Sequence, residues 1–138
     1  MDRHANAARY ARENPPPDDA TSVTVVRLPW PPSLNNLFAT VGRRRVRSAR
    51  YEAWLAEAGA VLVRQRPARI EGPFTAELTF TPPDRRLRDL DGLAKAPLDL
   101  LVKHGVVADD SLARELYLRW SGAPPLRHGL VEIRLEAA

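Results

Sequence analysis

The sequence has 138 residues, of which 44% are hydrophobic and 28% are charged, as is typical of one soluble globular domain. No stretch reaches the roughly 18 uncharged apolar residues that a membrane-spanning helix needs, which argues against an integral membrane protein. The absence of cysteine excludes disulfide scaffolds, zinc fingers and thiol nucleophiles. Because the first residues form no apolar signal segment, we expect a cytoplasmic protein.

The formal net charge is +4, and 19 of the 21 basic residues are arginine. Arginine binds phosphate through a planar, forked guanidinium, so this composition favours a nucleic-acid partner. The codon bias of a GC-rich genome would also raise the arginine content. Charge alone does not decide between these two interpretations.

Residues 1–21 contain few apolar side chains that could enter a core, and they include three consecutive prolines, Pro15 to Pro17. We therefore predict a disordered tail over residues 1–21 and a folded domain over residues 22–138. The domain opens with a short strand from Val23 to Leu28, which stops where three prolines fall within four positions. A basic run from Arg43 to Arg47 follows, in a loop or a short hairpin arm.

A helix and a strand are predicted next. Ser48 is a favourable N-cap for a helix that runs to about Gln65. Apolar residues on this segment recur at three- and four-residue steps, as on one buried helix face: Tyr51, Trp54, Leu55, Ala58 and Leu62. Residues 73–81 alternate apolar and polar side chains, which predicts a half-buried strand.

A second helix is predicted after Asp91. It ends at Gly105, because glycine is common just beyond a helix C-terminus. Pro97 in a helix interior would cost about 3 kcal/mol. We therefore expect the regular helix to begin later, near Leu93, or to be kinked.

Two further strands complete the prediction. Residues 115–120 and 129–135 alternate as strands, and the Gly-Ala-Pro-Pro sequence at residues 122–125 is interpreted as a hairpin between them. The order strand, helix, strand, helix, strand, strand predicts one α+β domain. It contains a small mixed sheet of about four strands with two helices on one face.

Aspartates carry the candidate chemistry. Asp89 and Asp91 form a D-x-D pattern, which places both carboxylates on one side of an extended backbone. Asp109 and Asp110 form a second acidic pair, of which only one is expected to face the same spot. Three carboxylates without cysteine or a histidine pair favour Mg²⁺ or Mn²⁺ over zinc. The alternative is that these aspartates are ordinary solvent-exposed residues, with Asp91 as a helix N-cap.

Basic residues surround these aspartates. Arg85, Arg86 and Arg88 precede the D-x-D pattern, and Lys95 follows Asp91 by four residues, which would place the two side by side on a helix. Lys95 is interpreted as a cation that contacts a phosphate or the charge that develops on it. The alternative for Lys95 is a surface ion pair. Basic side chains around an acidic metal cluster suit a phosphodiester substrate.

Three ordered motifs carry a family resemblance: LPWPPSLNN at residues 28–36, PDRRLRDLDGLAK at residues 83–95, and GVVADD at residues 105–110. Together they resemble the RusA family of Holliday-junction resolvases. The resemblance covers about residues 23–135. It implies a RusA-like fold and a homodimeric, Mg²⁺-dependent endonuclease that cuts four-way DNA junctions by paired nicks, in DNA recombination and repair.

The resemblance also implies roles for individual residues. Asp89, Asp91 and Asp110 match the essential, metal-holding carboxylates of the family, and Lys95 matches its catalytic lysine. Asp109 occupies the neighbouring acidic position, as a supporting group. Gly92 departs from the asparagine that the family commonly has after the D-x-D pattern, and Pro97 is a second departure.

The remaining arginines are interpreted as contacts to the DNA backbone: Arg43, Arg44, Arg45 and Arg47, together with Arg85, Arg86 and Arg88. Two alternatives stay open: a non-catalytic DNA-binding module that kept the fold, and a metal-dependent hydrolase of small phosphate esters. The main interpretation implies a nucleoid-associated protein, encoded by a bacterium or a phage.

Overall fold

The structure, a computed structural model, describes residues 23–138, so the predicted tail over residues 1–21 lies outside the described residues. No helix in the described part is long and apolar enough to cross a membrane. The elements follow in this order: β1 (Val23–Leu28), η1 (Leu34–Asn36), β2 (Phe38–Val41), β3 (Arg44–Arg47), α2 (Ala49–Gln65), β4 (Phe74–Thr81), η2 (Asp91–Leu93), α3 (Lys95–Lys103), η3 (Asp110–Leu112), β5 (Ala113–Trp120) and β6 (Leu130–Ala137).

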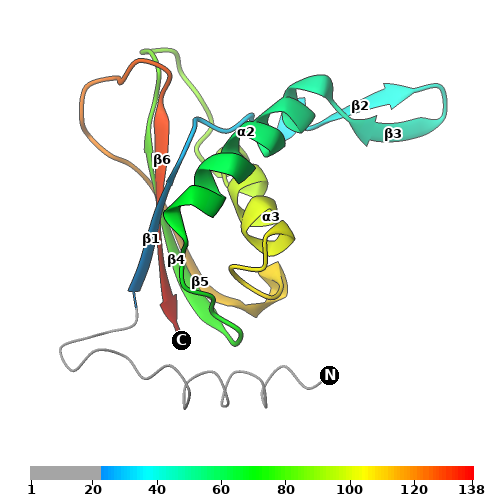
Figure 1. Cartoon of the computed structure of the whole chain (residues 1–138). Helices are drawn as coiled ribbons and strands as arrows, with labels where there is room; N and C mark the ends of the chain where they lie inside the picture. Colours follow the sequence, from blue (N-terminus) through cyan, green and yellow to red (C-terminus); the bar gives the residue numbers. More distant parts are fainter. Residues whose placement is uncertain (1–22) are drawn as a thin grey trace.

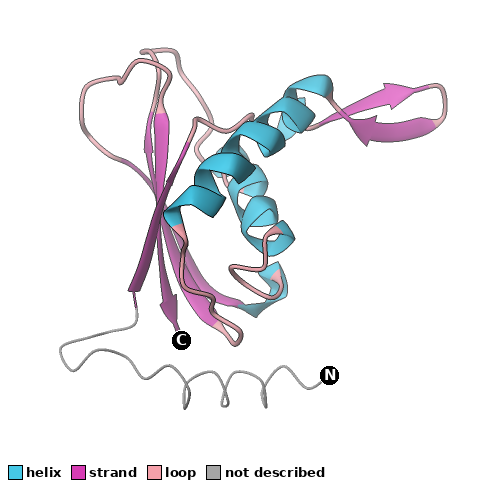
Figure 2. Ribbon diagram, viewed as in Figure 1, coloured by secondary structure: helices cyan, strands magenta, loops and turns pink. Residues whose placement is uncertain are grey.

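The main sheet has four strands in the order β1-β6-β4-β5. β6 runs antiparallel to both of its neighbours, whereas β4 and β5 are parallel. Helices α2 and α3 cover one face of this sheet (Figure 1), and the loops gather at its ends (Figure 2). The predicted α+β domain with a four-stranded mixed sheet and two helices is confirmed.

The hairpin predicted between the last two strands is wrong. β5 pairs with β4 at the edge of the sheet, and β6 inserts between β1 and β4. The connecting loop crosses the end of β4, where the backbone N–H groups of Ser121 and Leu126 donate to the carbonyls of Phe80 and Pro82. β6 takes the central place because its alternate residues Val131, Ile133 and Leu135 are fully buried against the helices.

Helix α2 matches its prediction. The Ser48 hydroxyl oxygen accepts a hydrogen bond from the Tyr51 backbone N–H at 3.0 Å, which caps the helix N-terminus. The predicted apolar face is buried along its length. Helix α2 lies against β1 and α3. Its apolar face belongs to the same core as the alternate side chains of β4, which are fully buried: Phe74, Ala76, Leu78 and Phe80.

Helix α3 explains how Pro97 is tolerated. The regular helix begins at Lys95, after the 3₁₀ turn η2, so Pro97 lies in the first turn, where its missing N–H leaves no hydrogen bond unmade. At the other end, Gly105 adopts φ +70°. The N–H groups of Gly105 and Val106 bond back to the carbonyls of Val102 and Leu101, which is the Schellman arrangement.

The basic run near residue 43 forms a hairpin arm. Strands β2 and β3 make a separate two-stranded antiparallel sheet. The arm projects away from the main sheet beyond the N-terminus of α2 (Figure 1). It therefore carries its outer arginines, Arg43 and Arg44, clear of the core.

Candidate active site

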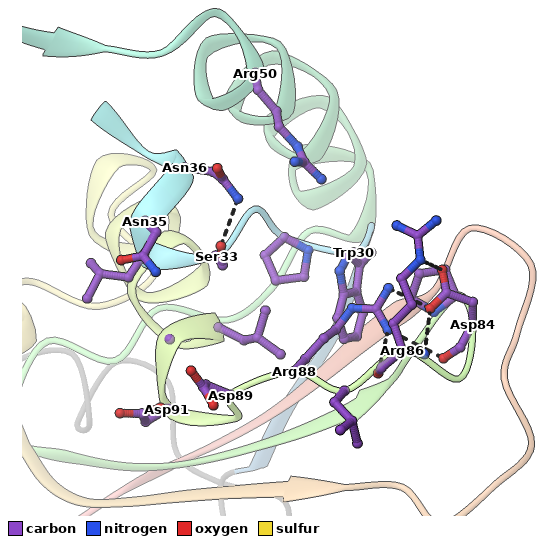
Figure 3. Close-up of a pocket in the computed structure, with 16 residues that line it drawn as sticks. Trp30, Ser33, Asn35, Asn36, Arg50, Asp84, Arg86, Arg88, Asp89 and Asp91 are labelled. Atoms are coloured by element: carbon purple, nitrogen blue, oxygen red, sulfur yellow. Dashed lines mark hydrogen bonds and ion pairs between the residues drawn. The ribbon is translucent and has the colours of Figure 1, made fainter. Parts of the chain in front are cut away.

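An open cavity of about 610 Å³ lies where three segments meet. One wall is the loop that contains Trp30 and the η1 turn, another is the first turn of α2 with Arg50, and the third is the segment over residues 83–93. Figure 3 shows the Asn35 and Asn36 side chains on one side of this space and Asp89 with Asp91 on another. The sequence motifs at residues 28–36 and 83–95 therefore meet at one place.

Asp89 and Asp91 lie close together at the edge of the cavity, and both are exposed (Figure 3). Asp91 begins the 3₁₀ turn η2, which the buried Leu93 anchors to the core. Asp91 is thus held by a turn, and Asp89 lies in the loop just before it, so the two aspartates do not lie together on the extended backbone that the D-x-D pattern predicts. A Cβ at Gly92 would meet only Leu34, at 3.8 Å or more, so the site has room for a larger residue there.

The wall opposite the aspartates is fixed by hydrogen bonds. The Asn36 amide donates to the Ser33 hydroxyl at 2.9 Å, and the Ser48 hydroxyl donates to the Asn36 carbonyl at 2.6 Å. These bonds tie η1 to the start of α2. Asn35 and Asn36 belong to the motif at residues 28–36 without an assigned role in it, and their place in the cavity, like that of Arg50, makes them candidate site residues.

Lys95 contacts different carboxylates from the one predicted. Its ammonium nitrogen lies 3.1 Å from Asp99 Oδ1 and 3.8 Å from Asp110 Oδ2. No ion pair between Lys95 and Asp91 forms among the described residues, because Asp91 belongs to the 3₁₀ turn and not to α3. The four-residue spacing from Asp91 is therefore not one turn of a regular helix.

The adjacent aspartates diverge, as expected. Asp109 is the N-cap of η3, and its carboxylate accepts a hydrogen bond from the Ser111 backbone N–H at 3.0 Å. Asp110 turns instead toward Lys95. Within the second acidic pair, Asp110 is the residue that meets the lysine.

Asp99 also lies in this group, although it belongs to none of the three sequence motifs. Its Oδ2 accepts a hydrogen bond from the Tyr51 hydroxyl at 3.3 Å. Burial of Tyr51, together with the nearby Asp99 carboxylate, raises the tyrosine pKa to about 12, so the hydroxyl remains a donor at neutral pH. The available sequence signal was the spacing of Asp99, four residues after Lys95 on one helix face.

The three arginines before Asp89 have different surroundings. Arg88 is 19% exposed and forms an ion pair of 2.8 Å with Asp84. Arg85 is exposed, and the Arg86 side chain is 83% exposed. The Arg86 backbone N–H donates to Asp84, and with the Arg88 guanidinium it holds the Asp84 pKa below its ordinary value.

Trp30 packs against the segment that precedes Asp89. Its ring stacks on Trp120, with centroids 6.3 Å apart and planes at 12°, and meets Phe80 edge-on. The Arg88 guanidinium lies 5.4 Å from the Trp30 ring centroid, within the range of a cation–π contact. Trp30 therefore acts as a packing anchor that joins the sheet to the segment before Asp89.

The arginines of the arm also differ from one another. Arg45 lies over the Phe38 ring at 4.5 Å, and Arg47 lies 5.9 Å from the Tyr51 ring centroid and 3.5 Å from the Glu52 carboxylate. Arg43 and Arg44 are exposed at the turn and at the start of β3. Arg43 and Arg44 are thus at the end of the arm farthest from the core.

The acidic residues suit a hard divalent cation without forming a complete cage. Within residues 23–138, no three histidine, aspartate or glutamate side chains gather as a ready-made metal site. Mg²⁺ is commonly held by one or two carboxylates, with water and substrate phosphate completing its coordination. The exposed carboxylates of Asp89 and Asp91, on one side of the cavity (Figure 3), fit that mode of binding.

Exposed carboxylates can hold a divalent cation and neighbouring arginines can contact phosphates, so this α+β domain carries the groups that action on a phosphodiester requires. The family model described as "Endodeoxyribonuclease RusA" matches residues 29–136. The chain belongs to this family, which confirms the resemblance seen in its motifs.

Curated relatives support the assignment. Three of them are named crossover junction endodeoxyribonuclease RusA and come from Escherichia coli (strain K12), Enterobacteria phage 82 and Shigella sonnei (strain Ss046). Each is 33% identical to this chain over 87 residues. The aligned part is 62% of this chain and 72% of each relative.

Proposed function

We propose that the protein is a structure-selective DNA endonuclease that resolves four-way junctions by paired nicks, in DNA recombination and repair. The observation that carries this proposal is the adjacent, exposed pair Asp89 and Asp91 at an arginine-flanked cavity, in a chain of the RusA family. The names of the relatives, crossover junction endodeoxyribonuclease, support the same substrate.

The proposed roles follow from charge and position. Asp89, Asp91 and Asp110 are the essential carboxylates, with Asp109 in support. Asp89 and Asp91 would hold Mg²⁺ or Mn²⁺. Asp110, which lies beside Lys95 and does not gather with the other two into a three-carboxylate cluster among residues 23–138, is proposed as the third ligand. Such an ion lowers the pKa of a bound water and offsets phosphate charge. Lys95 supplies a positive charge for the scissile phosphate, next to Asp110.

The exposed arginines are proposed to hold the DNA backbone. Arg43 and Arg44 occupy the outer part of the arm, and Arg85 and Arg86 flank the cavity loop. Guanidinium groups on two separate projections suit a long, branched polyanion better than a small phosphate ester. This separation disfavours the small-phosphoester alternative.

A homodimer is proposed because a four-way junction has near-two-fold symmetry, so that two identical sites can cut opposed strands. The free edge of β5 supports this assembly. No strand of the described chain pairs with that edge, and its apolar residues are unusually exposed: Leu116 by 43%, Tyr117 by 53% and Trp120 by 39%. Such an edge is suited to pairing with another strand.

The sequence of β5 is complementary to itself in one antiparallel register. If two copies pair about Tyr117, each Glu115 faces Arg119 of the second copy, and each Leu116 faces Leu118. Opposite charges and apolar side chains would then meet across the new strand pair, which favours that pairing. We propose this edge as the dimer contact.

The test is nicking of an end-labelled synthetic four-way junction with Mg²⁺, beside a linear duplex of the same sequence and the variant Asp89→Asn. Junction-specific nicks that vanish in the variant would establish the activity and place the site. Tight binding without nicks in Mg²⁺ or Mn²⁺ would instead support a non-catalytic binding module. Neither binding nor nicking would overturn the proposal and favour the small-phosphoester hydrolase.

A further inference from the structure

Tyr51, Asp99, Lys95 and Asp110 form a continuous chain of polar contacts that links α2, α3 and η3. The Tyr51 hydroxyl donates to Asp99 at 3.3 Å. The other oxygen of Asp99 lies 3.1 Å from the Lys95 ammonium, which lies 3.8 Å from Asp110. The lysine therefore lies between two carboxylates, and the Asp99 contact is the shorter one.

Tyr51, at one end of this series of polar contacts, is held rigidly. Tyr51 is 2% exposed, and its backbone N–H bonds to the Ser48 cap. Its ring meets Phe38 edge-on, with centroids 6.1 Å apart. The hydroxyl is consequently fixed in space, and it fixes the Asp99 carboxylate that accepts from it.

Lys95, by contrast, has an intrinsically flexible side chain. The Lys95 side chain is 46% exposed, and a lysine side chain has four rotatable bonds, so that an unpartnered ammonium would sample many positions. A carboxylate one helical turn away can hold that ammonium in one place. Asp99 stands at this spacing and is itself held.

We propose that Asp99 is a positioning residue, which, held by the Tyr51 hydroxyl, keeps the Lys95 ammonium beside Asp110 for its contact with the scissile phosphate. This inference rests on the proposed function for the role of Lys95. The placement of the lysine itself is a separate, physical claim. The two claims can be tested independently.

The placement can be read by NMR, because the chain contains only two lysines, Lys95 and Lys103. Full-length protein labelled with ¹³C-lysine should show two sets of side-chain methylene signals. In Asp99→Asn, the Lys95 signals should move toward those of a free lysine, with a smaller change in the same direction in Tyr51→Phe. The exposed Lys103 at the end of α3 serves as the internal control and should not move.

The functional consequence is measured by single-turnover cleavage of a labelled four-way junction. Asp99→Asn should lower the cleavage rate constant on the order of tenfold, since small displacements of reacting groups cost that much or more. The junction affinity should change by less than about twofold, because exposed phosphate contacts are unaltered. Glu57→Gln, the same chemical change on the exposed side of α2, should leave cleavage and affinity unchanged.

A double-mutant cycle separates positioning from a general structural effect. If Asp99 acts through Lys95, the variant with both Asp99→Asn and Lys95→Ala should cleave as slowly as Lys95→Ala alone. Full additivity of the two losses would overturn the proposal, and so would Lys95 signals that do not move in Asp99→Asn. If the wild-type protein cut no junction while the Lys95 signals moved as expected, the proposed endonuclease function would fail and the positioning would stand.

Discussion

Arg88 and Asp84 form an ion pair of 2.8 Å that closes the loop immediately before Asp89. The same guanidinium donates to the backbone carbonyls of Asp84 and Arg86 and lies over the Trp30 ring. Arg88 is the least exposed member of an arginine run that the sequence assigns to DNA contact. Its surroundings favour a different role, the fixing of the loop that presents Asp89.

We predict that Arg88→Ala destabilises the protein by about 1–2 kcal/mol, because it removes charged hydrogen bonds and a cation–π contact. Arg85→Ala, the matched change at an exposed arginine of the same loop, should change stability by less than about 0.5 kcal/mol. Urea unfolding followed by tryptophan fluorescence measures both. Equal effects of the two variants on stability would mean that Arg88 has no special role in fixing the loop.

The carboxylates should be needed for cleavage but not for binding. Asp89→Asn, Asp91→Asn and Asp110→Asn should each lower junction cleavage by on the order of 100-fold or more, since each removes a charge that the chemistry needs. Junction affinity should persist or rise, because the loss of a negative charge reduces repulsion of the DNA. Gel-shift and cleavage assays on one preparation separate these effects. Loss of binding would show a structural role instead.

The outer arginines of the arm should set the salt dependence of binding. Replacement of both Arg43 and Arg44 with alanine should weaken junction binding and make the slope of log K against log salt shallower by about two, one for each lost phosphate contact. Arg134→Ala, at an exposed position of β6 in the main sheet, is the matched control. An unchanged slope in the arm variant would mean that this basic run is only solvated.

The Tyr51 pKa gives a prediction with a defined sign. Because burial and Asp99 raise it to about 12 in the folded protein, while an unfolded tyrosine titrates near 10, its contribution to stability is full below about pH 10 and is lost as the pH rises toward 12. Asp99→Asn should lower this pKa, yet leave it above 10, since burial remains. The Tyr51 pKa is measured by NMR titration of protein labelled with ¹³Cζ-tyrosine. An unaltered pKa in the variant would contradict the contact.

Assembly through β5 is tested by exchange of charge. Glu115→Arg and Arg119→Glu should each weaken the dimer, because the proposed register then brings like charges together. The double variant should restore the dimer, since each pair is again opposite in sign. Sedimentation velocity on the three variants and the wild type provides the measurement. A wild-type monomer at micromolar concentration, or a double variant without recovery, would rule out this contact.

The local elements of the fold were predictable from local chemistry. The Ser48 cap, the apolar face of α2 and the end of α3 at Gly105 depend on residues within a turn or two of one another. Strand alternation located β4 in the same way. The ordered motifs also identified the family, since motif order needs no knowledge of contacts.

Tertiary structure decided what depends on distant partners. The place of β6 between β1 and β4 follows from burying whole strands beneath two helices, and the turn-rich Gly122–Pro125 segment suggested a hairpin that burial overrides. Likewise, Lys95 meets Asp99 and Asp110 rather than Asp91, because a 3₁₀ turn intervenes and the chain folds back after α3. Periodicity reports which face of an element is buried. It does not report which element covers that face, because this depends on the packing of the whole chain.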